Sequence, residues 1–318
     1  MPTPVKDSHQ MEKKADNAEG EGVTLPEYDN GTKPYLKIYR DYFFLVDFPR
    51  DLKSIPPFEV REDDIWISTF PKSGTTWVQE IVYLVMNNAD TGKALQTTIE
   101  RRVPFFEYPI PGFKAISAMP SPRLIKSHLP LSLLPDQMKA KKPKIIYVYR
   151  NPKDTVVSYY EFLVKFLTYT KFTGKFEDFC RLFTEGKVLC GPWWKHVTEA
   201  WARRHEDNFL LLCYEDLQAD LDKNVRIVAE FLGKSLTDEQ VARIVKHCSF
   251  DSMKNNNTVN YEWFKRKGLA RKEPKFLRNG KVGDWKNHLS PDIVKQFDEI
   301  VATKLPMDFP IKDTLSKL

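Results

Sequence analysis

The sequence lacks any hydrophobic stretch long enough to cross a bilayer. Its 318 residues contain no run of about eighteen consecutive apolar residues, the length that a membrane-spanning helix needs. The opening segment, 1–22, is polar and has none of the apolar core that marks a secretory signal peptide. We therefore expect a cytoplasmic protein that is neither exported nor attached to a membrane.

Cysteine and histidine are scarce and widely spaced, which argues against a metal site. No C-x-x-C pair occurs, so neither a zinc site nor a disulfide framework is predicted, and buried reduced thiols are expected. The four cysteines are Cys180, Cys190, Cys213 and Cys248. Three of the six histidines, His196, His205 and His247, lie in helical patterns, where packing or solvation is the ordinary role. Only His128 has a context that suggests chemistry.

The net charge of +6 comes mainly from one segment. Ten basic and three acidic residues lie between Lys254 and Lys286, and the rest of the chain is close to neutral. A protein that coats nucleic acid spreads its basic residues more widely, so no nucleic-acid partner is expected. A local excess suits a compact polyanionic ligand, although a solvated basic loop is the alternative that charge alone leaves open.

The order of hydrophobic patterns predicts an α/β fold. Short buried runs at residues 65–70, 123–127, 144–150 and 209–214 alternate with helical patterns of ten to fifteen residues. This alternation is typical of a parallel sheet with helices on both faces, which binds ligands beyond the carboxyl ends of its strands. We predict one domain over residues 31–318, preceded by a flexible polar arm, 1–30, that lacks periodicity.

The first motif, TFPKSGTTW at residues 69–77, follows a predicted strand and opens a helix. Free N–H groups and the dipole at a helix start bind anions, and Lys72 adds a full charge. The motif is not a Walker loop, because its lysine precedes the only glycine and no acidic magnesium ligand is evident. It therefore predicts phosphate binding without a metal; a plain capped helix is the alternative.

The second motif, LIKSHLP at residues 124–130, places Lys126 and His128 at the end of another strand. A neutral histidine can take a proton from an alcohol or phenol near pH 7. From this motif alone, a general base and a structural histidine remain equally open.

Two further motifs predict a second anion site. In YVYRNPKDTVVSYY, residues 147–160, Arg150 precedes a helix and Ser158 lies two turns into it. In FLRNGKVGDWK, residues 276–286, the pattern R-x-G-x-x-G-x-x-K combines cations with glycines that allow close backbone approach.

Together these four motifs resemble those of the cytosolic sulfotransferases, which use 3′-phosphoadenosine 5′-phosphosulfate (PAPS). The resemblance runs in order from about Pro34 to the C-terminus. It implies a sulfotransferase fold, PAPS as co-substrate with no metal, and sulfuryl transfer to a small hydrophobic acceptor such as a phenol, steroid or alcohol, or an amine. It makes His128 the general base, assisted by Lys72 and Lys126 at the sulfuryl group.

The resemblance also assigns binding residues. The 5′-phosphosulfate and adenine contacts it implies are Lys72, Ser73, Gly74, Thr75, Thr76, Trp77, Tyr214, Cys248, Phe250 and Met253. The contacts it implies for the 3′-phosphate are Arg150, Ser158, Arg278, Asn279 and Gly280. The aromatic acceptor wall it implies is Phe105, Phe106, Tyr108, Phe162, Phe166, Tyr169 and Trp263, with Tyr261 and Phe264 beside it.

Three positions depart from the family pattern. Asn279 replaces a lysine, which is expected to weaken the 3′-phosphate site, and Cys248 stands where a threonine is common. In the C-terminal dimer motif, Pro291 and Lys295 replace a valine and a glutamate. A monomer or weak homodimer is therefore expected. The alternative functions are a non-catalytic nucleotide-binding or scaffold protein on this fold and, with less support from the motifs, a P-loop kinase.

Overall fold

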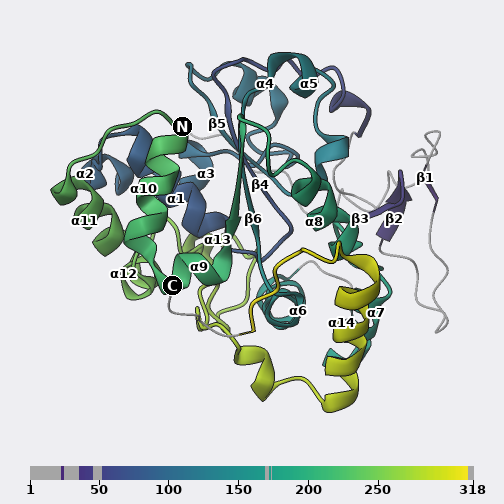
Figure 1. Ribbon diagram of the computed structural model, residues 1–318. Helices are drawn as coiled ribbons and strands as arrows, with labels where there is room; N and C mark the ends of the chain where they lie inside the picture. Colours follow the sequence, from purple (N-terminus) through teal and green to yellow (C-terminus); the bar gives the residue numbers. More distant parts are fainter. Residues whose placement is uncertain (1–22, 25–35, 46–51, 169–171, 173, 314–318) are drawn as a thin grey trace.

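The computed structural model describes residues 23–24, 36–45, 52–168, 172 and 174–313 (Figure 1). Most of the predicted arm and Tyr169 lie outside these residues. Within the arm, Val23–Thr24 form a short strand, β1. No helix in the described part of the chain combines the length and the apolar character needed to span a bilayer.

A parallel sheet of four strands forms the centre of the domain and confirms the predicted α/β class. Its strands are β4 (Ile65–Thr69), β5 (Leu124–Ser127), β6 (Lys144–Tyr149) and β7 (Phe209–Cys213), in the order β5-β4-β6-β7. Every residue of β4 and β5 is buried. This continuous burial is characteristic of parallel strands that are covered on both faces.

Helices cover both faces of this sheet (Figure 1). On one side lie α1 (Thr75–Met86) and α10 (Leu221–Phe231), and on the other α8 (Trp193–Ala202), α7 (Phe176–Thr184) and α14 (Pro291–Lys304). The remaining α-helices are α2 (Thr91–Ala94), α3 (Ile99–Arg102), α4 (Phe113–Ser117), α5 (Met138–Lys141), α6 (Pro152–Tyr160), α9 (Tyr214–Ala219), α11 (Asp238–His247), α12 (Phe250–Asn255) and α13 (Glu262–Arg266). Four further helical segments are the 3-10 helices Leu52–Ser54, Leu131–Leu133 and Asp284–Asn287 and the π-helix Glu161–Phe166, which continues α6.

A small antiparallel ribbon, which the sequence patterns did not predict, packs against the domain. It consists of β1, β2 (Leu36–Tyr39) and β3 (Tyr42–Leu45). Phe43 exchanges backbone hydrogen bonds with Cys190 and Gly191, at 2.7 and 3.0 Å. The Tyr42 hydroxyl donates to Glu199 of α8. These contacts fix the ribbon on the side of the domain formed by α8.

The largely apolar core contains a buried ion pair at the amino end of β4. The guanidinium of Arg123 donates to both oxygens of Asp64, its Nε at 2.7 Å from Oδ1. Both side chains are almost fully buried. The four cysteines are buried and free, as expected.

Removing one member of this pair should destabilise the domain strongly. Asp64→Ala leaves the Arg123 charge buried without its partner, so the free energy of unfolding should fall by about 3–5 kcal/mol. Asp63→Ala, at an exposed neighbouring position, is the matched control and should cost under about 0.5 kcal/mol. Urea denaturation of both variants measures the difference, and equal losses would contradict this role for the pair.

Candidate active site

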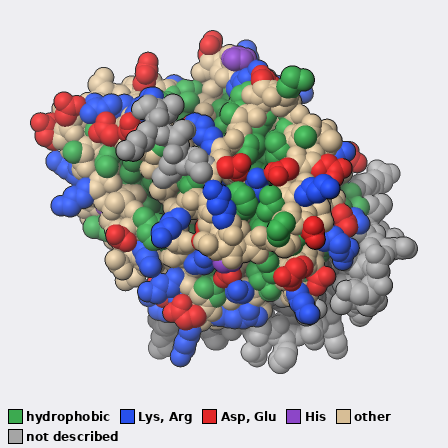
Figure 2. Space-filling view, turned by 60° about the horizontal axis from the view of Figure 1, so that its bottom comes forward, with side chains coloured by type: hydrophobic (Ala, Val, Ile, Leu, Met, Phe, Trp, Pro, Cys, Tyr) green, Lys and Arg blue, Asp and Glu red, His purple; other side chains and the backbone are tan. Residues whose placement is uncertain are grey.

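The predicted motifs meet at the carboxyl edge of the sheet. Lys72 follows β4, His128 follows β5, Arg150 follows β6, and Tyr214 follows β7. Because the four strands are parallel, these segments lie at one edge, at the bottom of Figure 1, where α6 begins directly after β6. Figure 2 turns this side forward and shows basic side chains interleaved with hydrophobic ones.

The turn after β4 has the backbone shape of an anion cradle. Lys72 and Gly74 both have positive φ, 68° and 101°. A Cβ at Gly74 would lie 2.7 Å from the Tyr214 ring, so the glycine is required here. Thr75 and Thr76 are buried in the first turn of α1, and the Thr75 hydroxyl lies 2.6 Å from that of Thr69.

Several buried polar atoms near this edge have no hydrogen-bond partner among the described residues. Two of them belong to the predicted anion-binding residues: the hydroxyl oxygen of Ser73 and Nε of Arg150. The Arg150 guanidinium otherwise donates only long hydrogen bonds, to the carbonyls of Lys72 (3.3 Å) and Lys281 (3.4 Å). Unsatisfied buried donors of this kind fit an anionic ligand that supplies the missing acceptors.

Three cations of the site rest on aromatic rings rather than on carboxylates. The Lys72 ammonium lies 4.5 and 4.1 Å from the ring centres of Phe162 and Phe276. Lys126 lies 4.2 Å over Phe105, and the Arg150 guanidinium 4.2 Å over Tyr214. None of the three cations forms an ion pair within the described part of the chain. Their charges are therefore available to a ligand.

Both lysines have depressed pKa values. Burial, reinforced by the charges of Arg150, Lys126 and Arg278, lowers the pKa of Lys72 to about 7. Burial also lowers the pKa of Lys126, against the opposing effect of the carboxylates of Glu100 and Glu107. An anion bound between them would favour their charged forms.

His128 is held in the tautomer that a general base needs. Its Nδ1 lies 2.9 Å from the carbonyl oxygen of Thr69. A carbonyl only accepts, so Nδ1 carries the proton and Nε2 keeps a free lone pair. Burial, with the nearby charge of Lys126, lowers the pKa of His128 well below its usual value, so the ring is neutral at pH 7.

Two residues outside the predicted set fix the backbone of His128. Glu107 is buried, and its carboxylate accepts from the His128 N–H at 2.6 Å and the Ser127 hydroxyl at 3.0 Å. Burial raises the pKa of Glu107 to about 7, although these hydrogen bonds lower it. On the other side, Nε2 of His196 donates to the His128 carbonyl at 3.2 Å, and its Nδ1 accepts from Tyr147 at 2.6 Å. His196 is therefore more than a packing residue.

The predicted 3′-phosphate residues lie on two segments that Asp154 of α6 joins. Its buried carboxylate accepts from the N–H groups of Gly283 and Trp285, at 2.7 and 3.0 Å. Partial burial opposes ionisation of Asp284, but its hydrogen bonds with Arg278 outweigh this and lower its pKa to about 2. The other predicted residues, Ser158, Asn279 and Gly280, are half-buried, and a Cβ at Gly280 would lie 2.3 Å from the Phe250 ring.

The predicted adenine residues gather around Trp77. Its indole N–H donates to the backbone carbonyl of Cys248 at 2.8 Å, and its ring meets Tyr214 edge-on at 5.7 Å. The Cys248 thiol is fully buried, and burial raises its pKa well above the usual range. Met253 is buried and Phe250 half-buried nearby on α12.

The acceptor-wall residues divide into two groups. Phe105 stacks on Tyr108 at 5.7 Å and meets the His128 ring edge-on at 5.1 Å. Around Phe276 lies a second aromatic cluster, formed with Phe162, Phe166 and Tyr261, which continues to Trp263 and Phe264.

Phe106 does not lie at the acceptor site, where the sequence predicted it. It is fully buried and packs on Phe58, Trp66 and Phe113, at 4.8, 4.9 and 4.8 Å. The reason is strand geometry: Phe105 bridges to Lys126 at the edge of β5, and the next side chain therefore points the other way. Phe106 belongs to the core, and we leave it out of the acceptor site.

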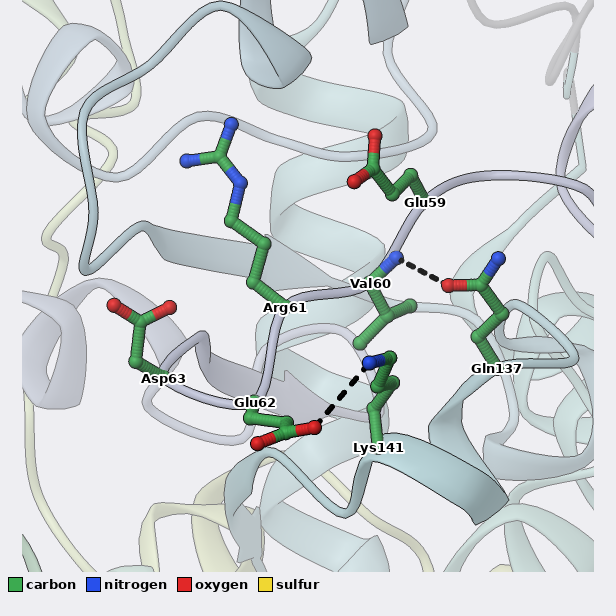
Figure 3. A pocket seen from close by; sticks show the side chains of 7 residues that line it. All are labelled: Glu59, Val60, Arg61, Glu62, Asp63, Gln137 and Lys141. Carbon is green, nitrogen blue, oxygen red and sulfur yellow. Dashed lines mark hydrogen bonds and ion pairs between the residues drawn. The ribbon is translucent and has the colours of Figure 1, made fainter.

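A separate hollow of about 690 Å³ lies at the other end of the sheet (Figure 3). It is lined by Glu59, Val60, Arg61, Glu62, Asp63, Gln137 and Lys141. These residues precede β4 and β6, so they lie at the amino edge. Lys141 pairs with Glu62, and Gln137 accepts from the Val60 N–H. The hollow is not part of the site formed by the motifs.

Comparisons with known proteins point to one family. A family model described as "Sulfotransferase domain" matches residues 62–307. The chain is 41% identical to Sulfotransferase 1E1 of Bos taurus over 255 residues, which cover 79% of this chain and 86% of the relative. It is 39% identical to Sulfotransferase 1B1 of Canis lupus familiaris over 276 residues, which cover 85% of this chain and 93% of the relative.

Solved structures of related proteins are similar to this chain in fold. Retinol dehydratase in complex with androsterone and the inactive cofactor PAP is similar at a TM-score of 0.79 and 29% identity, over 86% of this chain and 91% of that one. Mouse sulfotransferase SULT7A1 complexed with PAP is similar at a TM-score of 0.71 and 29% identity, over 86% of this chain and 95% of that one. The described residues contain no group of three or more His, Cys, Asp or Glu side chains that could hold a metal.

The depressed pKa of Lys72 predicts that binding of PAP, 3′-phosphoadenosine 5′-phosphate, is linked to proton uptake. In the free protein Lys72 loses its proton as the pH rises through about 7, whereas a bound anion restores the charged form. The dissociation constant should therefore rise by up to about tenfold per pH unit above pH 7. Calorimetry at pH 8 in two buffers of different ionisation enthalpy measures the uptake directly. Lys72→Met should remove it, and an unchanged uptake in that variant would contradict the assignment.

Proposed function

The chain belongs to the sulfotransferase family, and we propose that its His128 is the general base for transfer of a sulfuryl group from PAPS to a small hydrophobic acceptor. The enzyme class and PAPS as co-substrate follow from the relatives and from the PAP-bound structural neighbours. One observation carries the role of His128: Nδ1 is committed to the Thr69 carbonyl, which leaves Nε2 as the basic atom. We keep residues 31–318 as one sulfotransferase domain.

The charges at the site suggest how each residue contributes. The turn at residues 72–76 and the start of α1 would hold the 5′-phosphosulfate, and Arg150, Ser158, Arg278, Asn279 and Gly280 the 3′-phosphate. Lys72 and Lys126 would stabilise negative charge on the sulfuryl and bridging oxygens. Trp77, Tyr214, Phe250 and Met253 would surround the adenine.

The proton and bond changes then balance. Nε2 of His128 accepts the proton of the acceptor hydroxyl while the acceptor oxygen forms its bond to sulfur. The bond from sulfur to the phosphate oxygen breaks, and PAP leaves. The imidazolium that forms keeps its Nδ1 hydrogen bond to Thr69. Sulfuryl transfer of this kind depends mainly on positioning and charge stabilisation.

Hydrophobic acceptors with a hydroxyl group suit this site best. The aromatic rings of Phe105, Tyr108, Phe162 and Phe276 lie around His128 and Lys72, and aromatic walls favour flat apolar molecules. The retinol dehydratase structure holds androsterone, which supports acceptors of this kind. Small polar sugars accepted in preference to phenols would argue against this assignment.

A non-catalytic nucleotide-binding protein is the alternative, and a simple assay separates the two. Purified protein is incubated with PAPS and a phenol, with and without a chelator. A sulfated product that is insensitive to chelator supports the proposal. PAP binding without any sulfated product would favour the alternative.

We expect a monomer or a weak homodimer. Pro291 begins α14 and removes a backbone donor, and Lys295 supplies a positive charge, at positions where the family dimer motif has a valine and a glutamate. Light scattering at micromolar concentration should give a mass close to 37.2 kDa. A tight dimer that is abolished by changing Lys286 and Val294 would contradict this.

Binding and chemistry should separate in two variants. His128→Asn should lower turnover by about 10²–10⁴-fold with PAP affinity nearly unchanged, because His128 is assigned to the acceptor hydroxyl. Arg150→Ala should instead weaken PAP binding by about 2–5 kcal/mol, about thirty-fold to several-thousand-fold. Calorimetry and steady-state rates distinguish the two effects.

The matched controls are His205→Asn and Arg243→Ala, two exposed positions, and both should behave as wild type. If His128→Asn retains wild-type turnover at saturating substrates, with sulfation itself rate-limiting, His128 is not the base.

A further inference from the structure

The carboxylate of Glu80 lies at the junction of three segments. Glu80 is fully buried in α1, one turn beyond Trp77. Its Oε1 lies 2.8 Å from Nε2 of His247, and its Oε2 forms an ion pair with the Arg102 guanidinium at 2.8 Å. Both partner side chains are almost fully buried, and α1 packs against the helices that carry them, α11 and α3. The proposed reaction gives this cluster no role.

His247 connects Glu80 to the adenine side of the site. It is the last residue of α11, and because a carboxylate only accepts, its Nε2 carries the proton of the hydrogen bond. The next residue, Cys248, supplies the carbonyl that accepts from the Trp77 indole at 2.8 Å. Residues three apart on a helix are neighbours on its surface. One face of α1 therefore holds both sides of this contact, Trp77 directly and Cys248 through His247.

Arg102 connects Glu80 to the acceptor side. Its guanidinium lies 4.4 Å from the ring centre of Tyr83, one turn beyond Glu80 on α1, and its Nε donates to the Thr97 carbonyl at 3.1 Å. Ion pair, ring and carbonyl together fix the end of α3 against α1. A buried ion pair of this kind is sensitive to the loss of either partner.

The segment that follows α3, residues 103–106, carries this position into the active site. The Lys126 N–H of β5 donates to its second carbonyl at 2.9 Å, and the Lys126 carbonyl accepts from its last N–H at 2.8 Å. Gln79 of α1 donates to its first carbonyl at 3.2 Å. Phe105, within this segment, meets the His128 ring edge-on at 5.1 Å. The place of the Phe105 ring beside the proposed base is therefore set from α1.

We propose that Glu80 is a positioning residue that aligns the nucleotide and acceptor segments on one helix. Through His247 it holds the Cys248 carbonyl for Trp77, and through Arg102 it holds the segment that carries Phe105. The first turn of the same helix holds the 5′-phosphosulfate in the proposed function. The inference rests on that function and adds to it a buried residue that touches neither substrate.

Two variants separate the two connections. His247→Asn moves the donor away from Glu80, so the Kd for PAP should rise by about tenfold, the lower end of the range for a hydrogen bond to a charged group. The Kd of 2-naphthol for the PAP-bound protein should not change. Arg102→Met keeps most of the apolar volume and removes the charge, and it should give the opposite pattern. Glu80→Gln should raise both constants. Calorimetric titration measures each of them.

Matched substitutions control for a general loss of packing. His247→Gln places an amide nitrogen close to the position of Nε2, so it should keep the PAP affinity near that of the wild type. Arg101→Met, at an exposed neighbouring position, should leave both constants unchanged. Gln79→Met removes the second anchor of residues 103–106 and should weaken 2-naphthol binding alone. It tests the acceptor connection if Arg102→Met does not fold.

A contact that only stabilises the fold would not separate the two constants. Equal changes in both constants for His247→Asn and for Arg102→Met would overturn the inference, as would wild-type PAP affinity in His247→Asn. A wild-type protein that forms no sulfated 2-naphthol from PAPS, with the separation of the two constants intact, would overturn the proposed function and leave the positioning role of Glu80 supported.

Discussion

The hydrogen bond from His128 Nδ1 to the Thr69 carbonyl is the contact on which the rest of the site depends. Thr69 is the last residue of β4, and its side chain lies against Thr75 at the start of α1. One residue therefore sets the tautomer of the histidine and also contacts the anion-binding turn. The spacing between His128 and the turn at residues 72–76 is thus set by the parallel pairing of β4 and β5.

The site is electrostatically prepared for an anion because its cations are supported by rings. A carboxylate partner would hold a lysine in place and cancel its charge, and an anionic ligand would have to displace it. An aromatic face attracts a cation more weakly and leaves its charge uncompensated. Lys72, Lys126 and Arg150 follow this arrangement, whereas Arg278 is paired with Asp284. Burial lowers the pKa of both lysines, and for Lys72 the neighbouring charges of Arg150, Lys126 and Arg278 lower it further.

Most of the fold and the first contacts of the site could be predicted from the sequence. Short apolar runs located all four strands of the sheet, and the motifs after them located Lys72, His128 and Arg150, because functional residues at a strand end form a local sequence motif. Glu107, His196 and Asp154 were missed, since each acts on the backbone of a distant segment, and such a contact has no signature in the sequence. Phe106 was assigned wrongly to the acceptor site. The bridge between Phe105 and Lys126 decides which way the Phe106 side chain points, and that bridge cannot be inferred from the sequence. The ribbon of β1, β2 and β3 was missed for the same reason, since its strands are short and depend on tertiary contacts with α8.

The hydrogen bond between Trp77 and the carbonyl of Cys248 has a consequence for substitutions at position 248. Because the main chain supplies the acceptor, the contact does not depend on which side chain occupies position 248. A different side chain at position 248 that fits the buried space beside α11 should therefore leave this hydrogen bond in place.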